Sequence, residues 1–178
     1  MALGTINIFS KSLRRTVTFN VIIPADKMVF GQVESKKKEK VKPYKTLYLL
    51  HGIFGNYTDW VSGTRIQAWA QDHNCAVVMP SGDNKFYVDN ELSGDYYSKF
   101  IGEELVEVTR KMFNLSNKRE DTFIAGLSMG GYGALVNGLK YNKTFGYIAA
   151  LSAAVHMDHF INIKENAKNE ILSRSDLM

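Results

Sequence analysis

The stretch Gly126-Leu127-Ser128-Met129-Gly130 decides the expected fold, because of what lies on either side of it. Before it, Thr122-Phe123-Ile124-Ala125 is apolar and partly β-branched, which is typical of a buried strand. After it, residues 130–135 are mostly small and suit a closely packed helix. A serine flanked by glycines at a strand-to-helix turn matches a nucleophile elbow, where larger side chains two positions from the serine would collide. The pattern predicts that Ser128 projects its hydroxyl above the sheet as a nucleophile.

A second motif, His51-Gly52-Ile53-Phe54-Gly55, directly follows the apolar run Thr46-Leu47-Tyr48-Leu49-Leu50. Such a run predicts a strand buried on both faces. Ester hydrolysis passes through an oxyanion that backbone N–H groups stabilise. One donor belongs to the residue after the nucleophile, here Met129, and another to the loop after the third strand. We therefore expect an oxyanion hole. The plainer interpretation is a glycine turn at 51–55 and a glycine-rich turn with a capping serine at 126–130.

The remaining patterns alternate between strands and helices. Thr5 to Phe9 and Thr16 to Ile23 predict an antiparallel pair at the N-terminus. Later strands are expected at 46–50, 76–79, 121–125 and 147–151, and helices at 62–72, 93–113 and 128–141. We expect a single α/β domain over residues 1–178, with a mostly parallel sheet, helices on both faces and an antiparallel N-terminal edge.

Composition excludes several classes of protein. The 178 residues are 45% hydrophobic, enough for a core without staples. The single cysteine, Cys75, rules out an intramolecular disulfide and a multi-cysteine zinc site, and we expect it to be a buried apolar residue. No apolar run approaches the ~20 residues of a membrane span. The first fifteen residues lack the order of a secretory signal, which favours a cytoplasmic protein.

The net charge of +4 comes from one segment. Between Glu34 and Lys45 there are six lysines and two glutamates, so this segment accounts for the whole imbalance. It contains no arginine, which a phosphate-binding surface favours, and we interpret it as a solvated loop. We therefore expect neither a nucleic acid nor a membrane as partner.

The motifs together resemble the putative-esterase family of α/β-hydrolases, in particular its tributyrin-esterase branch. This family includes esterase D-like S-formylglutathione hydrolases, feruloyl and acetyl xylan esterases and mycolyltransferases. The matching segments occur in order along nearly the whole chain: 49–55 with Asp59-Trp60, 79–84 with Phe86-Tyr87, and 125–134.

The resemblance implies an α/β-hydrolase fold and a serine carboxylic-ester hydrolase. The substrates would be small-molecule short-chain acyl or acyl-sugar esters, attacked through an acyl-enzyme on Ser128, with neither cofactor nor metal. It implies that the amides of Ile53 and Met129 form the oxyanion hole. It also suggests that Asn84, Phe86 and Tyr87 line the substrate pocket.

The acid and base are not identified by the sequence. In this fold they follow the nucleophile in the order acid, then histidine. Only residues 129–178 follow Ser128, and we find one further strand in them. The family is longer here, so we expect a C-terminally truncated fold that lacks its last strands. The candidates present are Asp158, His156 and His159. His51 precedes Ser128 and is expected to shape its loop.

Three alternatives stay open at this point. The chain could be a catalytically inactive, truncated hydrolase fragment, or the full-length protein could be an S-formylglutathione hydrolase or an acyltransferase. The S-formylglutathione hydrolases usually carry histidine where this sequence has Leu127 and Tyr132, which counts against that activity. An open apolar strand at 147–151 would also favour pairing into a homo-oligomer.

Overall fold

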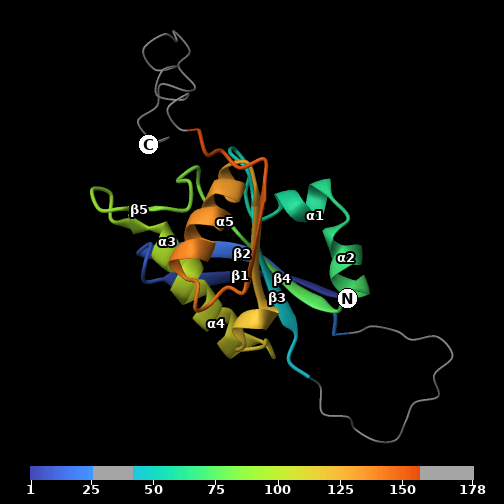
Figure 1. Cartoon of the computed structure of the whole chain (residues 1–178). Coiled ribbons are helices and arrows are strands. Elements are labelled where there is room, and N and C mark those ends of the chain that lie inside the picture. Colours follow the sequence, from blue (N-terminus) through green and yellow to red (C-terminus); the bar gives the residue numbers. More distant parts are fainter. Residues whose placement is uncertain (26–41, 157–178) are drawn as a thin grey trace, which may run out of the picture.

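Six strands form the central sheet of this computed structural model, which describes residues 1–25 and 42–156. They are β1 (Ala2–Ser10), β2 (Arg15–Ile23), β3 (Lys45–Leu50), β4 (Cys75–Pro80), β7 (Thr122–Leu127) and β8 (Tyr147–Leu151). Their order is β1-β2-β4-β3-β7-β8 (Figure 1). The last four in this order run parallel, whereas β1 and β2 form an antiparallel hairpin that also joins β4 in antiparallel fashion. The expected mostly parallel sheet with an antiparallel N-terminal edge is confirmed.

Helices cover both faces of this sheet. On one face lie α1 (Asp59–Gly63) and α2 (Ile66–Asp72), and on the other α3 (Tyr97–Lys99), α4 (Leu105–Met112) and α5 (Met129–Lys140) (Figure 1). Successive strand residues point to opposite faces, so the sheet builds two cores. The larger core joins Tyr48, Leu50, Val78 and Ile124 with Phe100, Leu105 and Met129, and the smaller joins Leu49, Val77, Met79 and Ala125 with Ile66 and Ala70.

The helix expected at 93–113 begins only at Tyr97. Residues before Tyr97 belong to a small antiparallel pair, β5 (Asp89–Asn90) and β6 (Asp95–Tyr96). A π-helical turn, η1 (Phe100–Glu104), then separates α3 from α4. Its extra residue rotates the helix that follows, which buries Thr109 and leaves Met112 47% exposed.

Two shorter elements also differ from expectation. The helix expected at 62–72 is divided, because Thr64 adopts an extended conformation between α1 and α2. A short 3₁₀ turn, η2 (Arg119–Asp121), precedes β7. None of the described helices is long and apolar enough to cross a membrane.

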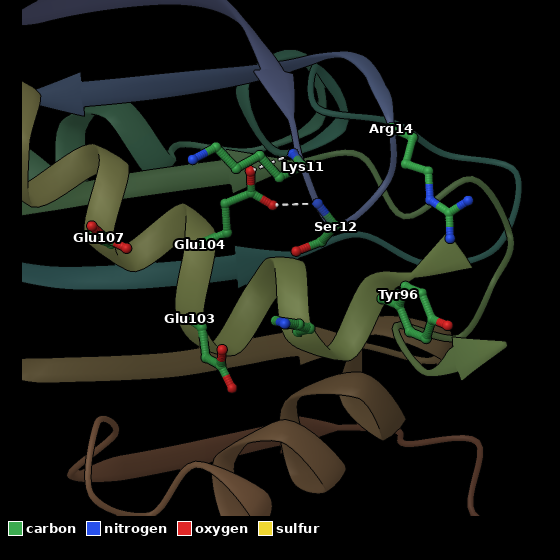
Figure 2. Close-up of a pocket in the computed structure, with 8 residues that line it drawn as sticks. Lys11, Ser12, Arg14, Tyr96, Glu103, Glu104 and Glu107 are labelled. Carbon is green, nitrogen blue, oxygen red and sulfur yellow. Dashed lines mark hydrogen bonds between the residues drawn. The ribbon is translucent and has the colours of Figure 1, made fainter. Parts of the chain in front are cut away.

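The turn between β1 and β2 is attached to the π-helical turn by one carboxylate. Glu104 accepts hydrogen bonds from the backbone N–H groups of Lys11 and Ser12 (Figure 2). It also accepts one from the Ser10 hydroxyl. Burial raises the pKa of Glu104, but these hydrogen bonds outweigh it and lower the pKa overall. The surrounding hollow of ≈ 370 Å³ carries both cations and carboxylates. We interpret it as the surface around this attachment.

For two features of the sequence, the lysine segment and Cys75, the structure gives only a partial match to expectation. The lysine segment lies mostly outside the described residues, although its last member, Lys45, begins β3 and lies 3.8 Å from the carboxylate of Asp121. Cys75 begins β4 and is half-buried rather than fully buried, and burial raises the pKa of its thiol to about 11. The high pKa keeps this thiol protonated and unreactive near neutral pH.

Replacing Gly138 with alanine should destabilise the protein. A methyl group there would lie 2.4 Å from the Ile148 side chain, so α5 could no longer pack as closely on β8. We expect a loss of about 1–3 kcal/mol in the free energy of unfolding, measured by chemical denaturation. Gly63→Ala in α1 is the matched control, because no atom lies within 4 Å of the added methyl. Equal stability of the two variants would contradict this packing argument.

Candidate functional site

Ser128 occupies the sharp turn between β7 and α5. Its backbone is strained, with φ 56° and ψ −115°, a region that non-glycine residues rarely adopt. A methyl group on Gly126 would lie 2.2 Å from the Gly130 carbonyl oxygen, and one on Gly130 would lie 2.4 Å from that of Leu50. Both glycines are therefore required sterically. The elbow geometry expected from the motif is present.

Backbone hydrogen bonds to α5, to the end of β8 and to the residues after it hold this turn. The Ser128 N–H donates to the Leu151 carbonyl at 2.9 Å. The Ser128 carbonyl accepts from the N–H groups of Tyr132 at 3.0 Å and Ala154 at 3.2 Å. Because these bonds occupy both the N–H and the carbonyl of Ser128, the hydroxyl is the polar group of this residue that can react. Within residues 1–25 and 42–156, no side chain hydrogen-bonds to that hydroxyl.

The HG loop, residues 51–57, passes close to Ser128. A methyl group on Gly52 would lie only 3.7 Å from Cβ of Ser128. Across the described ranges, the N–H groups of Ile53 and Met129 donate to no other group of the chain. Met129 is the first residue of the twelve-residue helix α5, whose N-terminal end favours negative charge. The structure thus places Gly52, the neighbour of Ile53, beside the elbow at which Met129 begins α5, with the Met129 side chain buried and Ile53 half-buried.

His51 is buried and holds the HG loop in place. Its Nε2 accepts the Gly82 N–H at 2.8 Å, so the proton resides on Nδ1, which donates to the Gly52 carbonyl at 2.6 Å. Burial lowers the pKa of His51 and favours the neutral ring. Because both nitrogens are engaged, His51 shapes the loop and does not serve Ser128 as a base.

The loop after β4 supports the HG loop. The Asn84 side-chain oxygen accepts the Phe54 N–H at 2.7 Å. Phe86 is 8% exposed and packs edge-on against Tyr132. Tyr87 is fully buried, and its hydroxyl donates to the His51 carbonyl at 3.0 Å. In the described structure these three residues contact the HG loop and α5, and the expectation that they border the substrate pocket stays a prediction.

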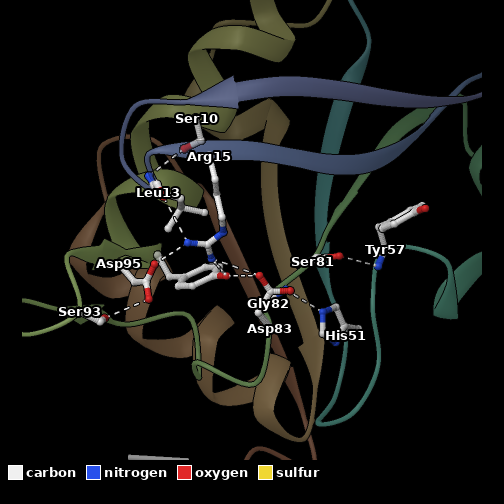
Figure 3. A network of polar contacts seen from close by, with 11 residues as sticks. Ser10, Leu13, Arg15, His51, Tyr57, Ser81, Gly82, Asp83, Ser93 and Asp95 are labelled. Carbon is white, nitrogen blue, oxygen red and sulfur yellow. Dashed lines mark hydrogen bonds and ion pairs between the residues drawn. The ribbon is translucent and has the colours of Figure 1, made fainter. Parts of the chain in front are cut away.

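Sequence reasoning missed the polar network that anchors this loop. Arg15 forms an ion pair with Asp83 at 3.3 Å and another with Asp95 at 2.5 Å, and it donates to the Tyr97 hydroxyl at 2.6 Å. Tyr97 in turn donates to Asp83. Figure 3 shows the contacts running from Arg15 toward Gly82 and His51.

This network shifts the titration of its members. The hydrogen bond from Arg15 lowers the pKa of Asp95. Burial, followed by its hydrogen bond to Asp83, raises the pKa of the Tyr97 phenol. Asp95 is thus held as an anion and Tyr97 as a neutral donor. Arg15 directly follows Arg14 in a basic turn, so no local pattern in the sequence indicated this network.

The described residues do not complete a catalytic triad. His156 is exposed and follows Ala154, which bonds to Ser128, by two residues. The other two candidates, Asp158 and His159, lie outside the described residues. His73 ends α2 and is exposed. In the same described part of the chain, no group of three or more histidine, cysteine or acidic residues could hold a metal ion.

Stability should depend on pH through His51. The folded state lowers the pKa of this histidine, so the unfolded state binds a proton more readily. As pH falls below the ordinary value of 6.5, the unfolded state gains protons first and stability is lost. We expect His51→Gln to reduce the loss measured between pH 7 and pH 5 by urea denaturation. Parallel pH profiles of the two proteins would contradict the buried neutral ring.

Sequence comparison places this geometry among known hydrolases. The family model described as "Putative esterase" matches residues 10–170. An acetyl esterase from Caldicellulosiruptor saccharolyticus is 46% identical over 173 residues, which cover 97% of this chain and 64% of that protein. The chain thus spans less than two thirds of this relative's length.

Solved structures of longer proteins share the fold. FphF, a fluorophosphonate-binding serine hydrolase of Staphylococcus aureus, superposes with a TM-score of 0.78 at 33% identity, over 90% of this chain and 60% of its own. The S-formylglutathione hydrolase FrmB of the same species gives 0.77 at 32% identity, over 99% and 65%. These similarities confirm the expected α/β-hydrolase fold. On the strength of the matched family model and the elbow geometry, the chain belongs to the putative-esterase family of α/β-hydrolases.

Proposed function

We propose that this chain carries the nucleophile and the oxyanion hole of a serine carboxylic-ester hydrolase for short-chain acyl or acyl-sugar esters. The observation that carries the proposal is the strained Ser128 between two uncommitted amides, those of Ile53 and Met129. The acetyl esterase relative and a ferulic acid esterase structure at 26% identity support an ester of a small or sugar-linked acid. No metal and no cofactor enter this chemistry.

The proposed reaction proceeds through an acyl-enzyme. The Ser128 Oγ forms a bond to the ester carbonyl carbon, the bond to the alcohol oxygen breaks, and the serine proton leaves with the alcohol. Water then attacks the acyl-enzyme and releases the acid. The carbonyl oxygen carries negative charge in both steps, and the amides of Ile53 and Met129 stabilise it. One such donor contributes about 3–4 kcal/mol to the barrier reduction.

The acid and base remain a hypothesis carried by His156, His159 and Asp158. The supporting observation is that the chain shortly before these residues hydrogen-bonds to Ser128 through Leu151 and Ala154. Replacing both histidines with alanine would test this assignment, since loss of a triad member costs a factor of about 10⁴ or more in turnover.

Two other activities use the same acyl-enzyme. The similarity to FrmB favours S-formylglutathione hydrolysis, whereas Leu127 and Tyr132 replace the histidines usual in that activity. Acyl transfer to an alcohol or sugar differs from hydrolysis only in the acceptor. Product analysis with an acetyl ester, a formyl thioester and an added alcohol separates the three.

A second copy of the chain is the partner we propose for β8. Among the described residues this strand pairs only with β7, and its outer side chains include exposed Tyr147 (63%) and Leu151 (47%). β8 contains no charged residue. An uncharged, apolar open edge invites pairing with another strand.

Ser128→Ala should abolish covalent labelling by a fluorophosphonate probe. The probe reacts with an activated serine hydroxyl, and the elbow presents that of Ser128. Ser152→Ala is the matched control, because Ser152 is also left-handed (φ 44°) and lies one residue after β8. Peptide mass spectrometry locates the label. A folded chain that takes up no label would support the inactive-fragment alternative, and label on another serine would contradict the assignment of Ser128.

Ala149→Lys should prevent self-association. A lysine in the middle of β8 places a charge on the open edge, which strands avoid burying. Leu92→Lys adds the same charge on the fully exposed turn between β5 and β6 and should leave association unchanged. Sedimentation velocity at several concentrations distinguishes the two variants. A monomeric wild-type chain, or equal behaviour of both variants, would overturn the proposed edge pairing.

A further inference from the structure

The support loop, residues 81–88, has an unusually strained backbone. Asp83, Asn84, Phe86 and Tyr87 all have positive φ, between 44° and 58°. Bulky residues such as phenylalanine and tyrosine rarely adopt this region. Strain of this kind persists only where surrounding contacts impose it, and it gathers at functional sites. The contacts of the support loop should therefore show which elements impose this strain and which part of the site the loop positions.

Three elements hold the support loop from outside. From α5, the side-chain amide of Asn137 donates to the Tyr87 carbonyl at 3.0 Å. The Tyr87 ring fills the space beside Gly133, where an added methyl would lie 2.5 Å from it. On the opposite side, Arg15 and Tyr97 hold the Asp83 carboxylate (Figure 3). The loop is thus fixed to the same helix that begins at the nucleophile.

Four hydrogen bonds connect the support loop to the HG loop. Two involve His51, which accepts from the Gly82 N–H and from the Tyr87 hydroxyl. A third runs from the Tyr57 N–H to the Ser81 hydroxyl at 3.2 Å. The fourth and shortest runs from the Phe54 N–H to the Asn84 side-chain oxygen at 2.7 Å.

The fourth bond acts next to the expected oxyanion donor. Phe54 is left-handed (φ 66°), yet its side chain is 66% exposed, so packing does not impose this conformation. In the described structure its N–H has the Asn84 oxygen as partner. Ile53 and Phe54 carry successive backbone N–H groups. Asn84 therefore accepts the N–H of Phe54 and leaves the N–H of Ile53 for another acceptor.

We infer that Asn84 is a positioning residue: by binding the Phe54 N–H, it orients the HG loop so that the Ile53 N–H faces the oxyanion formed at Ser128. This role rests on the proposed function, and it stands beside the prediction that Asn84 borders the pocket. An asparagine suits the position twice, because it tolerates positive φ and its carbonyl oxygen reaches the neighbouring loop.

The test separates the side chain from the backbone conformation. Asn84→Gly keeps the left-handed conformation available and removes the acceptor. Asn84→Asp keeps both the conformation and an acceptor oxygen and should rescue the loss at least in part. Asn74→Gly is the matched control, because Asn74 is also left-handed (φ 49°) but lies in the turn before β4.

Two readouts are measured on the whole chain. Hydrogen exchange of the Phe54 amide should be about tenfold faster in Asn84→Gly than in the wild type, and unchanged in Asn74→Gly. Fluorophosphonate labelling of Ser128 should slow by about 10- to 100-fold in Asn84→Gly, as expected for a misplaced donor. With p-nitrophenyl acetate, kcat should decrease by the same factor, whereas KM should stay within about twofold of the wild-type value. Circular dichroism confirms that each variant is folded.

Each outcome decides the inference. Unchanged exchange at Phe54 would show that Asn84 does not hold this amide, whatever the activity. Faster exchange with unchanged labelling of Ser128 would reduce Asn84 to a structural role and overturn the inference. If the wild-type chain itself takes up no label, the proposed function fails first. The exchange experiment then still decides whether Asn84 orients the loop, and the catalytic part of the inference falls with the proposed function.

Discussion

The site depends on the absence of side chains where β7 turns into α5. The backbone of Gly130 lies against the carbonyl oxygens of Leu50 and His51, closer than any side-chain carbon would permit. This contact brings the first turn of α5 directly onto the end of β3. The HG loop leaves β3 at that point, so Ser128 and the loop that carries the proposed oxyanion donor Ile53 become neighbours. A single methyl group at Gly126 or Gly130 would separate them.

The residues around this contact form many hydrogen bonds and ion pairs, which offset the backbone strain at the site. A strained Ser128 and a strained support loop each raise the free energy of the folded state by roughly 1–3 kcal/mol per unfavourable residue. Buried groups offset this strain: His51 uses both ring nitrogens and Tyr87 its hydroxyl. Arg15 adds a charge-assisted network at the far side of the loop. The geometry at the site therefore relies on contacts up to the β1–β2 hairpin.

Local patterns were sufficient to predict the six strands of the central sheet, the elbow and the loop after β3, but not the small pair β5 and β6. Each depends on residues adjacent in the chain, such as the glycines around Ser128 or the apolar run before His51. The π-helical turn at 100–104 was not predictable, because a hydrophobic stripe assumes a constant 3.6-residue period. The roles of Asn84 and Tyr87 were also hidden. They arise from bonds to segments some thirty or more residues away, which no local pattern encodes.

The described residues hold the proposed nucleophile and oxyanion donors, whereas the proposed acid and base lie at and beyond the end of the described part. In the proposed reaction the two amides stabilise charge on the substrate, and without a base such a site accelerates hydrolysis by about 10³–10⁴ over water. A base paired with Ser128 multiplies this by several further orders of magnitude. Because Ala154 bonds to the nucleophile's own carbonyl, the chain that follows β8 starts beside the serine. The absolute turnover of the wild-type chain therefore distinguishes an oxyanion hole acting alone from one served by a histidine of this segment.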